Sequence, residues 1–183
     1  EVSPFISWFT NYIYLQPTGE WSILPHAGQI YKYSGVEALL TGGEISGEVD
    51  ILREVTLAVS GEYVYTYNLD ANTALSFSPP ISLRSTLSYH PGQMRLYLET
   101  ECIAAQNRIS RNEDPTPGAQ LFHAGASFFI PWMKNKLEVT ISANNLFDTR
   151  YYNHLSFYRK IDIPEPGRNF QLLIKIPFKT LLK

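Results

Sequence analysis

Disulfides, thiolate metal clusters and membrane helices are excluded by what this chain lacks. Cys102 is its only cysteine, so no pair of cysteines can cross-link the fold or hold a metal. No stretch approaches the run of about 18 apolar residues that a membrane-spanning helix needs. The 183 residues carry 15 lysines and arginines against 17 aspartates and glutamates. That balance lacks the basic surface that nucleic acid requires, so no nucleic-acid partner is expected.

Signatures of catalysis and of cofactor binding are also missing. The four histidines are far apart in the sequence, and no Ser-His-Asp spacing stands out. The pair Gly42-Gly43 is followed by neither a helix nor the lysine and serine or threonine of a phosphate-binding loop. The sequence therefore predicts a protein that is not an enzyme and that has no cofactor and no metal site.

Alternation of apolar and polar side chains is the strongest pattern that the chain contains. The segments 137–144 and 170–178 place an apolar residue at every second position. A period of two is typical of a β-strand with one apolar and one polar face. A soluble sandwich gives the same pattern, so alternation alone does not identify the solvent that meets the apolar face.

The lengths of the connections between such segments decide this question. Long connections alternate with short ones, which places all long loops at one end of an antiparallel sheet. Outer-membrane barrels have this asymmetry, with short periplasmic turns and long outer loops. The sequence thus predicts an all-β, antiparallel transmembrane barrel. The eight strands are expected at 3–15, 29–50, 54–68, 81–90, 94–106, 118–131, 135–147 and 168–178.

Two further features accompany this interpretation. The second expected strand contains Gly42, Gly43 and Gly47, which indicates a bulge or a split into two strands. Aromatic residues make up 14% of the chain and gather near the expected strand ends, where barrels carry interfacial girdles. The alternative for these aromatics is the core of a soluble protein. Tyr12 and Tyr14 are among the residues expected in a girdle.

Two motifs near the end of the chain carry a family likeness. One is the Asn-Asn-Leu-Phe-Asp sequence that closes the seventh expected strand, and the other is the Pro-Gly-Arg sequence that opens the eighth. Together they resemble the C-terminal end of TonB-dependent outer-membrane receptors, and the likeness extends over nearly the whole chain. The matching residues are Asn144, Asn145, Leu146, Phe147, Asp148, Pro166, Gly167 and Arg168, and their expected role is structural.

The resemblance implies that residues 1–183 are the C-terminal part of a larger barrel. In this family the barrel has roughly twenty-two strands, and an N-terminal plug domain, absent here, fills it. The implied function is active uptake of a scarce nutrient, such as an iron siderophore or another metal chelate, across the outer membrane of a Gram-negative bacterium. The implied partners are the plug and remaining strands, the TonB-ExbB-ExbD complex, the barrel-assembly machinery, lipopolysaccharide and lipid.

Aromatic and cationic residues on the expected outer loops are the candidates for ligand contact. Such side chains suit an anionic, aromatic chelate; ordinary loop solubility and contact with lipopolysaccharide phosphates are the alternative explanations. The candidates are His26, Arg108, Arg111, Tyr151, Tyr152, His154, Tyr158 and Arg159.

Eight strands taken from a larger barrel have two open edges, and unpaired backbone groups are costly in a bilayer. The fragment is therefore expected to pair with the missing strands, in the same or a separate chain. The alternative is a small barrel that closes on itself and has a passive-pore, structural or adhesive role.

Overall fold

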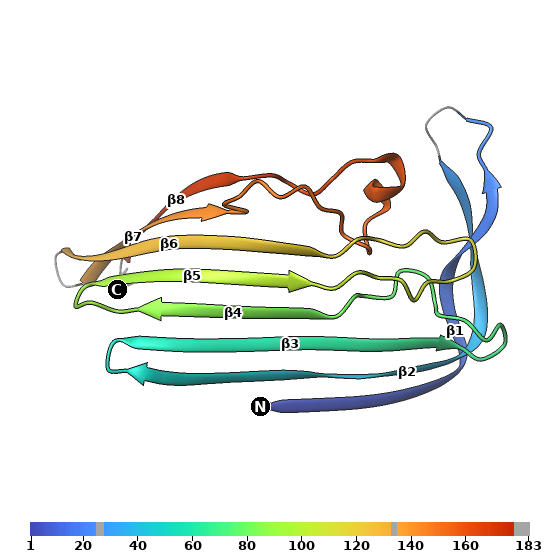
Figure 1. The fold of residues 1–183 in the computed structure, drawn as a ribbon, viewed down its shortest axis with the longest axis horizontal. Helices are drawn as coiled ribbons and strands as arrows, with labels where there is room; N and C mark the ends of the chain where they lie inside the picture. Colours follow the sequence, from blue (N-terminus) through green and yellow to red (C-terminus); the bar gives the residue numbers. More distant parts are fainter. Residues whose placement is uncertain (25–27, 133–134, 178–183) are drawn as a thin grey trace, which may run out of the picture.

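The computed structural model describes residues 1–24, 28–132 and 135–177. Within them, eight strands form one antiparallel sheet in which each strand pairs with its neighbours in the sequence (Figure 1). The all-β prediction is confirmed. The strands are β1 (Val2–Trp21), β2 (Gln29–Leu52), β3 (Val55–Asn68), β4 (Ser82–Tyr89), β5 (Met94–Ile103), β6 (Ala119–Trp132), β7 (Asn135–Asn144) and β8 (Asn169–Lys175).

Short helical structure is present in one loop: a 3-10 helix, η1, spans Phe157–Ile161. None of the helices in the described part of the chain has the length and apolar character needed to cross a membrane.

The glycines of β2 neither split nor bulge this strand as expected. The strand runs unbroken from Gln29 to Leu52, and its register with β3 is regular from Ala38 to Asp50. A side chain at Gly42 would collide with the carbonyl oxygen of Tyr63 on β3, so glycine permits close approach of the two backbones here. The pairing irregularities fall elsewhere: between β1 and β2 at Phe9/Tyr12 and at Pro17/Trp21, and between β2 and β3 at Asp50/Leu52, near the end of β2. Bulges of this kind bend a strand, and the upper part of the β1–β2 hairpin turns away from the sheet (Figure 1).

Long and short connections lie at opposite ends of the sheet, as the sequence predicts (Figure 1). The β3–β4 loop (69–81), the β5–β6 loop (104–118) and the β7–β8 loop (145–168) lie beside the part of the β1–β2 hairpin that turns away from the sheet. We call this the loop end and the opposite side the turn end. Residues 133–134, which join β6 to β7, lie outside the described residues.

Strand register sorts the side chains onto two chemically different faces. Polar and charged residues from β2 to β7, including Glu48, Arg95, Glu99 and Glu138, line one shared hollow, so this is the concave face. The opposite face is apolar, as a barrel wall in lipid requires. Its cross-strand rows contain Ile45, Val49, Leu57, Val59, Leu83, Leu87, Leu96, Leu98, Ala126, Phe128, Val139, Ile141, Leu172 and Ile174.

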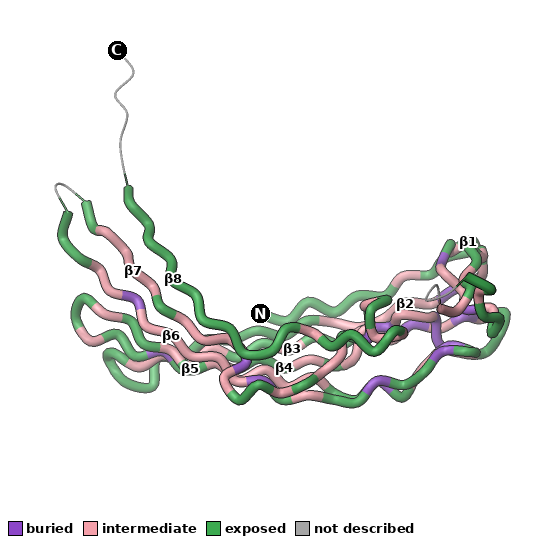
Figure 2. Tube along the Cα trace, turned by 90° about the horizontal axis from the view of Figure 1, so that it is seen from above, coloured by how far each residue is buried: buried purple, intermediate pink, exposed green. Residues whose placement is uncertain are grey.

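The sheet is a curved section with two free edges rather than a closed cylinder. Within the described residues, β1 pairs only with β2 and β8 only with β7. Figure 2 shows the curvature and also shows that the buried residues gather mostly at the loop end. Most strand residues are only partly covered, because a sheet one layer thick has no second layer to bury its faces.

Some of the aromatic residues lie where a girdle would. On the apolar face, Tyr89 and Trp132 stand at the turn end, and Tyr63 stands toward the loop end. Tyr12 and Tyr14 do not lie in a girdle position. Their side chains pack with Ala38 and Leu75 in a small core at the loop end, and the hydroxyl of Tyr14 accepts a hydrogen bond from Asn68. The girdle interpretation is therefore wrong for these two residues.

Candidate functional site

Three loops meet at one buried carboxylate at the loop end, that of Glu113 on the β5–β6 loop. The backbone N–H of Phe77, on the β3–β4 loop, donates to Glu113 Oε1 at 3.0 Å, and the N–H of Ser110 donates to Oε2 at 3.1 Å. Two side chains of the β7–β8 loop complete the set. Arg159 Nη2 lies 3.0 Å and His154 Nε2 lies 3.4 Å from Oε1. We call these contacts the Glu113 network.

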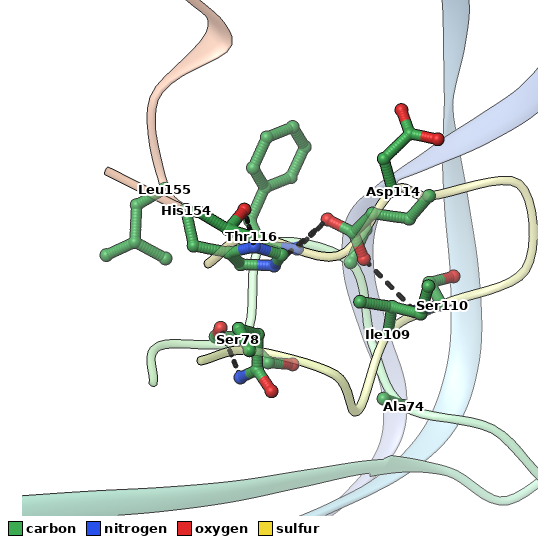
Figure 3. A network of polar contacts seen from close by, with 12 residues as sticks. Ala74, Ser78, Ile109, Ser110, Asp114, Thr116, His154 and Leu155 are labelled. Carbon is green, nitrogen blue, oxygen red and sulfur yellow. Dashed lines mark hydrogen bonds and ion pairs between the residues drawn. The ribbon is translucent and has the colours of Figure 1, made fainter. Parts of the chain in front are cut away.

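The side chains of the Glu113 network are almost fully shielded from water. Glu113 and His154 are 1% exposed and Arg159 is 5% exposed. His154 Nδ1 lies 2.8 Å from Thr116 Oγ1 (Figure 3). Arg159 also donates from Nε to the carbonyl of His154 and from Nη1 to the carbonyl of Asp114. A charge buried this deeply is tolerated because it is both paired and hydrogen-bonded.

Two opposing effects act on the pKa of Glu113. Burial raises the pKa, whereas the nearby imidazole of His154 and the backbone N–H groups of Phe77 and Ser110 lower it. These polar contacts outweigh burial, so the pKa lies below its ordinary value of 4.5. Glu113 is accordingly ionised at neutral pH and carries the negative charge that Arg159 needs.

A lowered pKa in the folded state makes the Glu113 network dependent on pH in a defined direction. The stabilisation is fully present above the ordinary glutamate pKa and is lost as the pH falls through the lowered folded value. We therefore expect the β5–β6 loop amides to keep their protection at pH 5, measured as the exchange rate relative to that of an unfolded chain at the same pH. This protection should fall only once the pH is well below 4.5. In Glu113→Gln this acid-induced step should disappear, and an unchanged step would assign it to another group.

Aromatic packing joins the hairpin to two of the loops. The rings of Tyr31 on β2, Phe77 on the β3–β4 loop and Phe157 in η1 lie 4.8 to 5.7 Å apart between centroids. Such edge-to-face and tilted contacts are favourable beyond the area that they bury. Gln29 Nε2 adds a hydrogen bond to the carbonyl of Asn112 on the β5–β6 loop.

Gln106 makes a separate connection between the β3–β4 and β5–β6 loops. Its Nε2 donates to the carbonyls of Ser78 and Pro79 at 2.9 and 3.1 Å, and its Oε1 accepts from the N–H of Arg108. The Gln106 backbone also pairs with that of Thr116. The β1–β2 hairpin and the three loops at the loop end are thus all connected to one another.

The Asn-Asn-Leu-Phe-Asp and Pro-Gly-Arg motifs close the base of the β7–β8 loop. Asn145 is buried. Its Nδ2 donates hydrogen bonds to the carbonyls of Thr149 and Pro166, and its Oδ1 accepts one from the N–H of Thr149. The carboxylate of Asp148 accepts from the N–H of Arg168 at 2.8 Å. Asn145 and Asp148 both have positive φ angles, 49° and 57°, which asparagine and aspartate tolerate better than most residues.

Replacing Asn145 with alanine should loosen this base without disturbing the strands. The change removes three hydrogen bonds and leaves the Thr149 N–H without its partner, a loss of about 1–3 kcal/mol. We expect faster proteolysis within the β7–β8 loop, measured by limited digestion of outer-membrane vesicles. Asn153→Ala, on an exposed position of the same loop, is the control. Equal digestion of both variants would contradict a specific role for Asn145.

The structure separates the eight predicted ligand-contact residues into different environments. His154 and Arg159 are buried in the Glu113 network, and the guanidinium of Arg108 lies 3.6 Å from the ring centroid of Tyr65. Arg111 is exposed and Tyr151 is half-buried. Tyr158 is 64% exposed. His26 lies outside the described residues. Ligand contact by any of the eight stays a prediction.

Most cations of these loops are already paired with protein groups. Arg150 Nη2 lies 2.7 Å from the hydroxyl of Tyr152 and 3.1 Å from Asp162 Oδ1. Lys160 Nζ lies 2.7 Å from Asp114 Oδ2. The sequence offers no signal for the two ion pairs, because Asp162 lies on the other leg of the β7–β8 loop and Asp114 lies on the β5–β6 loop. The role of Glu113 as the meeting point is the main feature that the sequence did not reveal.

A second polar network runs along the concave face. Arg84 on β4 pairs with Glu101 on β5 at 3.3 Å, and Glu101 lies 3.8 Å from His123 on β6. His123 Nδ1 then lies 3.3 Å from Asn144 Oδ1 on β7. In the described residues, no three histidine, cysteine, aspartate or glutamate side chains gather closely enough to hold a metal.

Comparison with known proteins identifies the fold. No protein-family model and no curated protein matches the chain in sequence. Among solved structures, the copper transporter OprC aligns with 92% of this chain at a TM-score of 0.79 and 23% identity. FpvA of P. aeruginosa, solved with pyoverdine and iron, aligns with 93% at a TM-score of 0.59 and 16% identity. The chain spans only 28% and 24% of these proteins. It has the fold of a portion of a TonB-dependent receptor barrel.

Proposed function

We propose that residues 1–183 form the C-terminal wall and outer loops of an outer-membrane receptor that takes up a scarce nutrient. The plug and the remaining strands belong to the same or a separate chain, and energy comes from the TonB-ExbB-ExbD complex. The structural match to the copper transporter carries this proposal. The apolar convex face supports it, because that face suits lipid.

The cargo that we propose is a metal chelate such as an iron siderophore. The two neighbours support a metal cargo, since one is described as a copper transporter and the other was solved with pyoverdine and iron. Among the ligand-contact candidates within the described residues, Tyr158 and Arg111 at the loop end are exposed to solvent. His154 and Arg159 would act through the shape of the loops rather than by direct contact.

The free edges of the sheet argue against a small barrel that closes on itself. In the described residues β1 and β8 each have one partner strand, and an unpaired strand edge is costly in lipid. Pairing with additional strands satisfies both edges, so the receptor portion is favoured over the passive eight-stranded pore.

Uptake in cells tests the proposal. Cells with and without the gene would be supplied with radioiron-labelled ferric pyoverdine or with Cu²⁺, in backgrounds with and without TonB. We expect uptake of one of these cargoes to require both the gene and TonB. Uptake that requires the gene but not TonB would indicate a passive pore, and uptake independent of the gene would refute the transport proposal for both cargoes.

A further inference from the structure

The β7–β8 loop is tied at three places, twice between its own two legs and once to the other segments of the loop end. At its base, Asn145 and Asp148 join the two legs. Midway, the N–H of Glu165 donates to the carbonyl of Tyr151 at 2.9 Å. At the far end, η1 supplies Arg159 to the Glu113 network and Phe157 to the aromatic cluster. The two inner ties make the β7–β8 loop stiff, and the contacts of η1 fix its far end to the other segments.

We infer that the β1–β2 hairpin and the β3–β4, β5–β6 and β7–β8 loops form one fixed rim. We further infer that cargo enters without separate movement of the β7–β8 loop. Movement of this loop alone would separate Arg159 and His154 from Glu113. It would also expose these three buried side chains to water. It would also separate Phe157 from Tyr31 and Phe77, which lie on two other segments. Moving one segment alone breaks contacts with the others and costs free energy, whereas moving the rim as a whole keeps these contacts. The low-energy motions are therefore those that move the rim as a whole.

A small pocket lies where the β7–β8 loop meets the concave face. Tyr151, Leu155 and Glu165 of the loop line it together with Glu62 and Glu101 of the wall. The pocket exists with every tie of the loop intact, so a group of matching size can enter it without rupture of the Glu113 network.

Cross-linking two segments of the rim tests the inference, which rests on the proposed function for one of its two readouts. Asp114 and Lys160 are ion-paired across the β5–β6 and β7–β8 loops, so cysteines at both positions should react with a short, reducible bis-maleimide. Cys102→Ser provides the background, and the full receptor in its own outer membrane is the sample. We expect efficient cross-linking and uptake within about twofold of the untreated double variant.

Two results would overturn the inference. A tenfold fall in uptake on cross-linking, reversed by cleaving the linker, would show that the β7–β8 loop must move. Failure to cross-link would show that the two loops are not held together. If untreated receptor takes up neither ferric pyoverdine nor Cu²⁺, the transport proposal fails and the rim is judged by hydrogen exchange. A fixed rim predicts that amides of the three loops exchange at similar slow rates, whereas exchange at least tenfold faster in the β7–β8 loop alone would refute it.

Discussion

Replacing Glu113 with glutamine is expected to loosen the outer loops more than any other single isosteric change. The glutamine amide cannot neutralise Arg159, and its NH₂ group would face a backbone donor, either Phe77 or Ser110. Removing one partner of a buried ion pair costs about 3–5 kcal/mol. A loss of 3 kcal/mol raises the equilibrium population of the locally open state by roughly a hundredfold. Hydrogen exchange in the β5–β6 and β7–β8 loops should accelerate together by about this factor.

Two further variants make this prediction specific. Asp114→Asn removes the partner of Lys160 in the same loop, but Asp114 is largely exposed, so exchange should change less than fivefold. Glu113→Gln combined with Arg159→Met removes both buried charges and should recover part of the lost protection, since apolar residues can replace a buried pair. Wild-type exchange rates in Glu113→Gln would contradict the proposed importance of this carboxylate.

Introducing arginine at Ile141 should block insertion into the outer membrane. Ile141 lies on the convex face of β7, between Ala126 on β6 and Leu172 on β8. Arginine facing lipid near the middle of the bilayer costs about 2–4 kcal/mol. We expect at least a tenfold loss of folded, heat-modifiable receptor in outer-membrane fractions, measured by electrophoresis with and without boiling.

The neighbouring residue Thr140 provides a matched control. Its side chain is on the concave face, where it hydrogen-bonds Ser127 at 2.8 Å and lines the polar hollow with Glu138. Arginine at Thr140 should leave the amount of inserted receptor within about threefold of wild type, because it meets polar groups rather than lipid. Equal losses for Ile141→Arg and Thr140→Arg would mean that the two faces do not meet different solvents.

Strand positions were predictable because alternation is a local property of the sequence. All eight strands begin within one residue of the expected positions. β1 extends to Trp21, beyond the expected end at residue 15, because Pro17 and Trp21 pair with Tyr31 and Gln29 on β2. A pairing partner of this kind extends a strand whose own sequence carries little β signal.

The arrangement of the outer loops was much less predictable. Arg159 and Glu113 are 46 residues apart, and nothing in either local sequence distinguishes this pair from other oppositely charged loop residues. The helix η1 has only five residues, too few for a helical period to emerge. By contrast, the motif residues Asn145 and Asp148 were singled out through resemblance, and the structure supplies their physical reason in the positive φ angles and hydrogen bonds at the loop base.

The central claim is that the convex face lies in the outer membrane with the loop end outside. Labelling single cysteines with a membrane-impermeant maleimide, in intact cells and after outer-membrane permeabilisation, tests it most directly. In a Cys102→Ser background, we predict that Tyr158→Cys labels in intact cells and that Gln93→Cys, at the turn end, labels only after permeabilisation. Ile141→Cys should label in neither. Labelling of Gln93→Cys in intact cells, or of Ile141→Cys in either sample, would contradict the account.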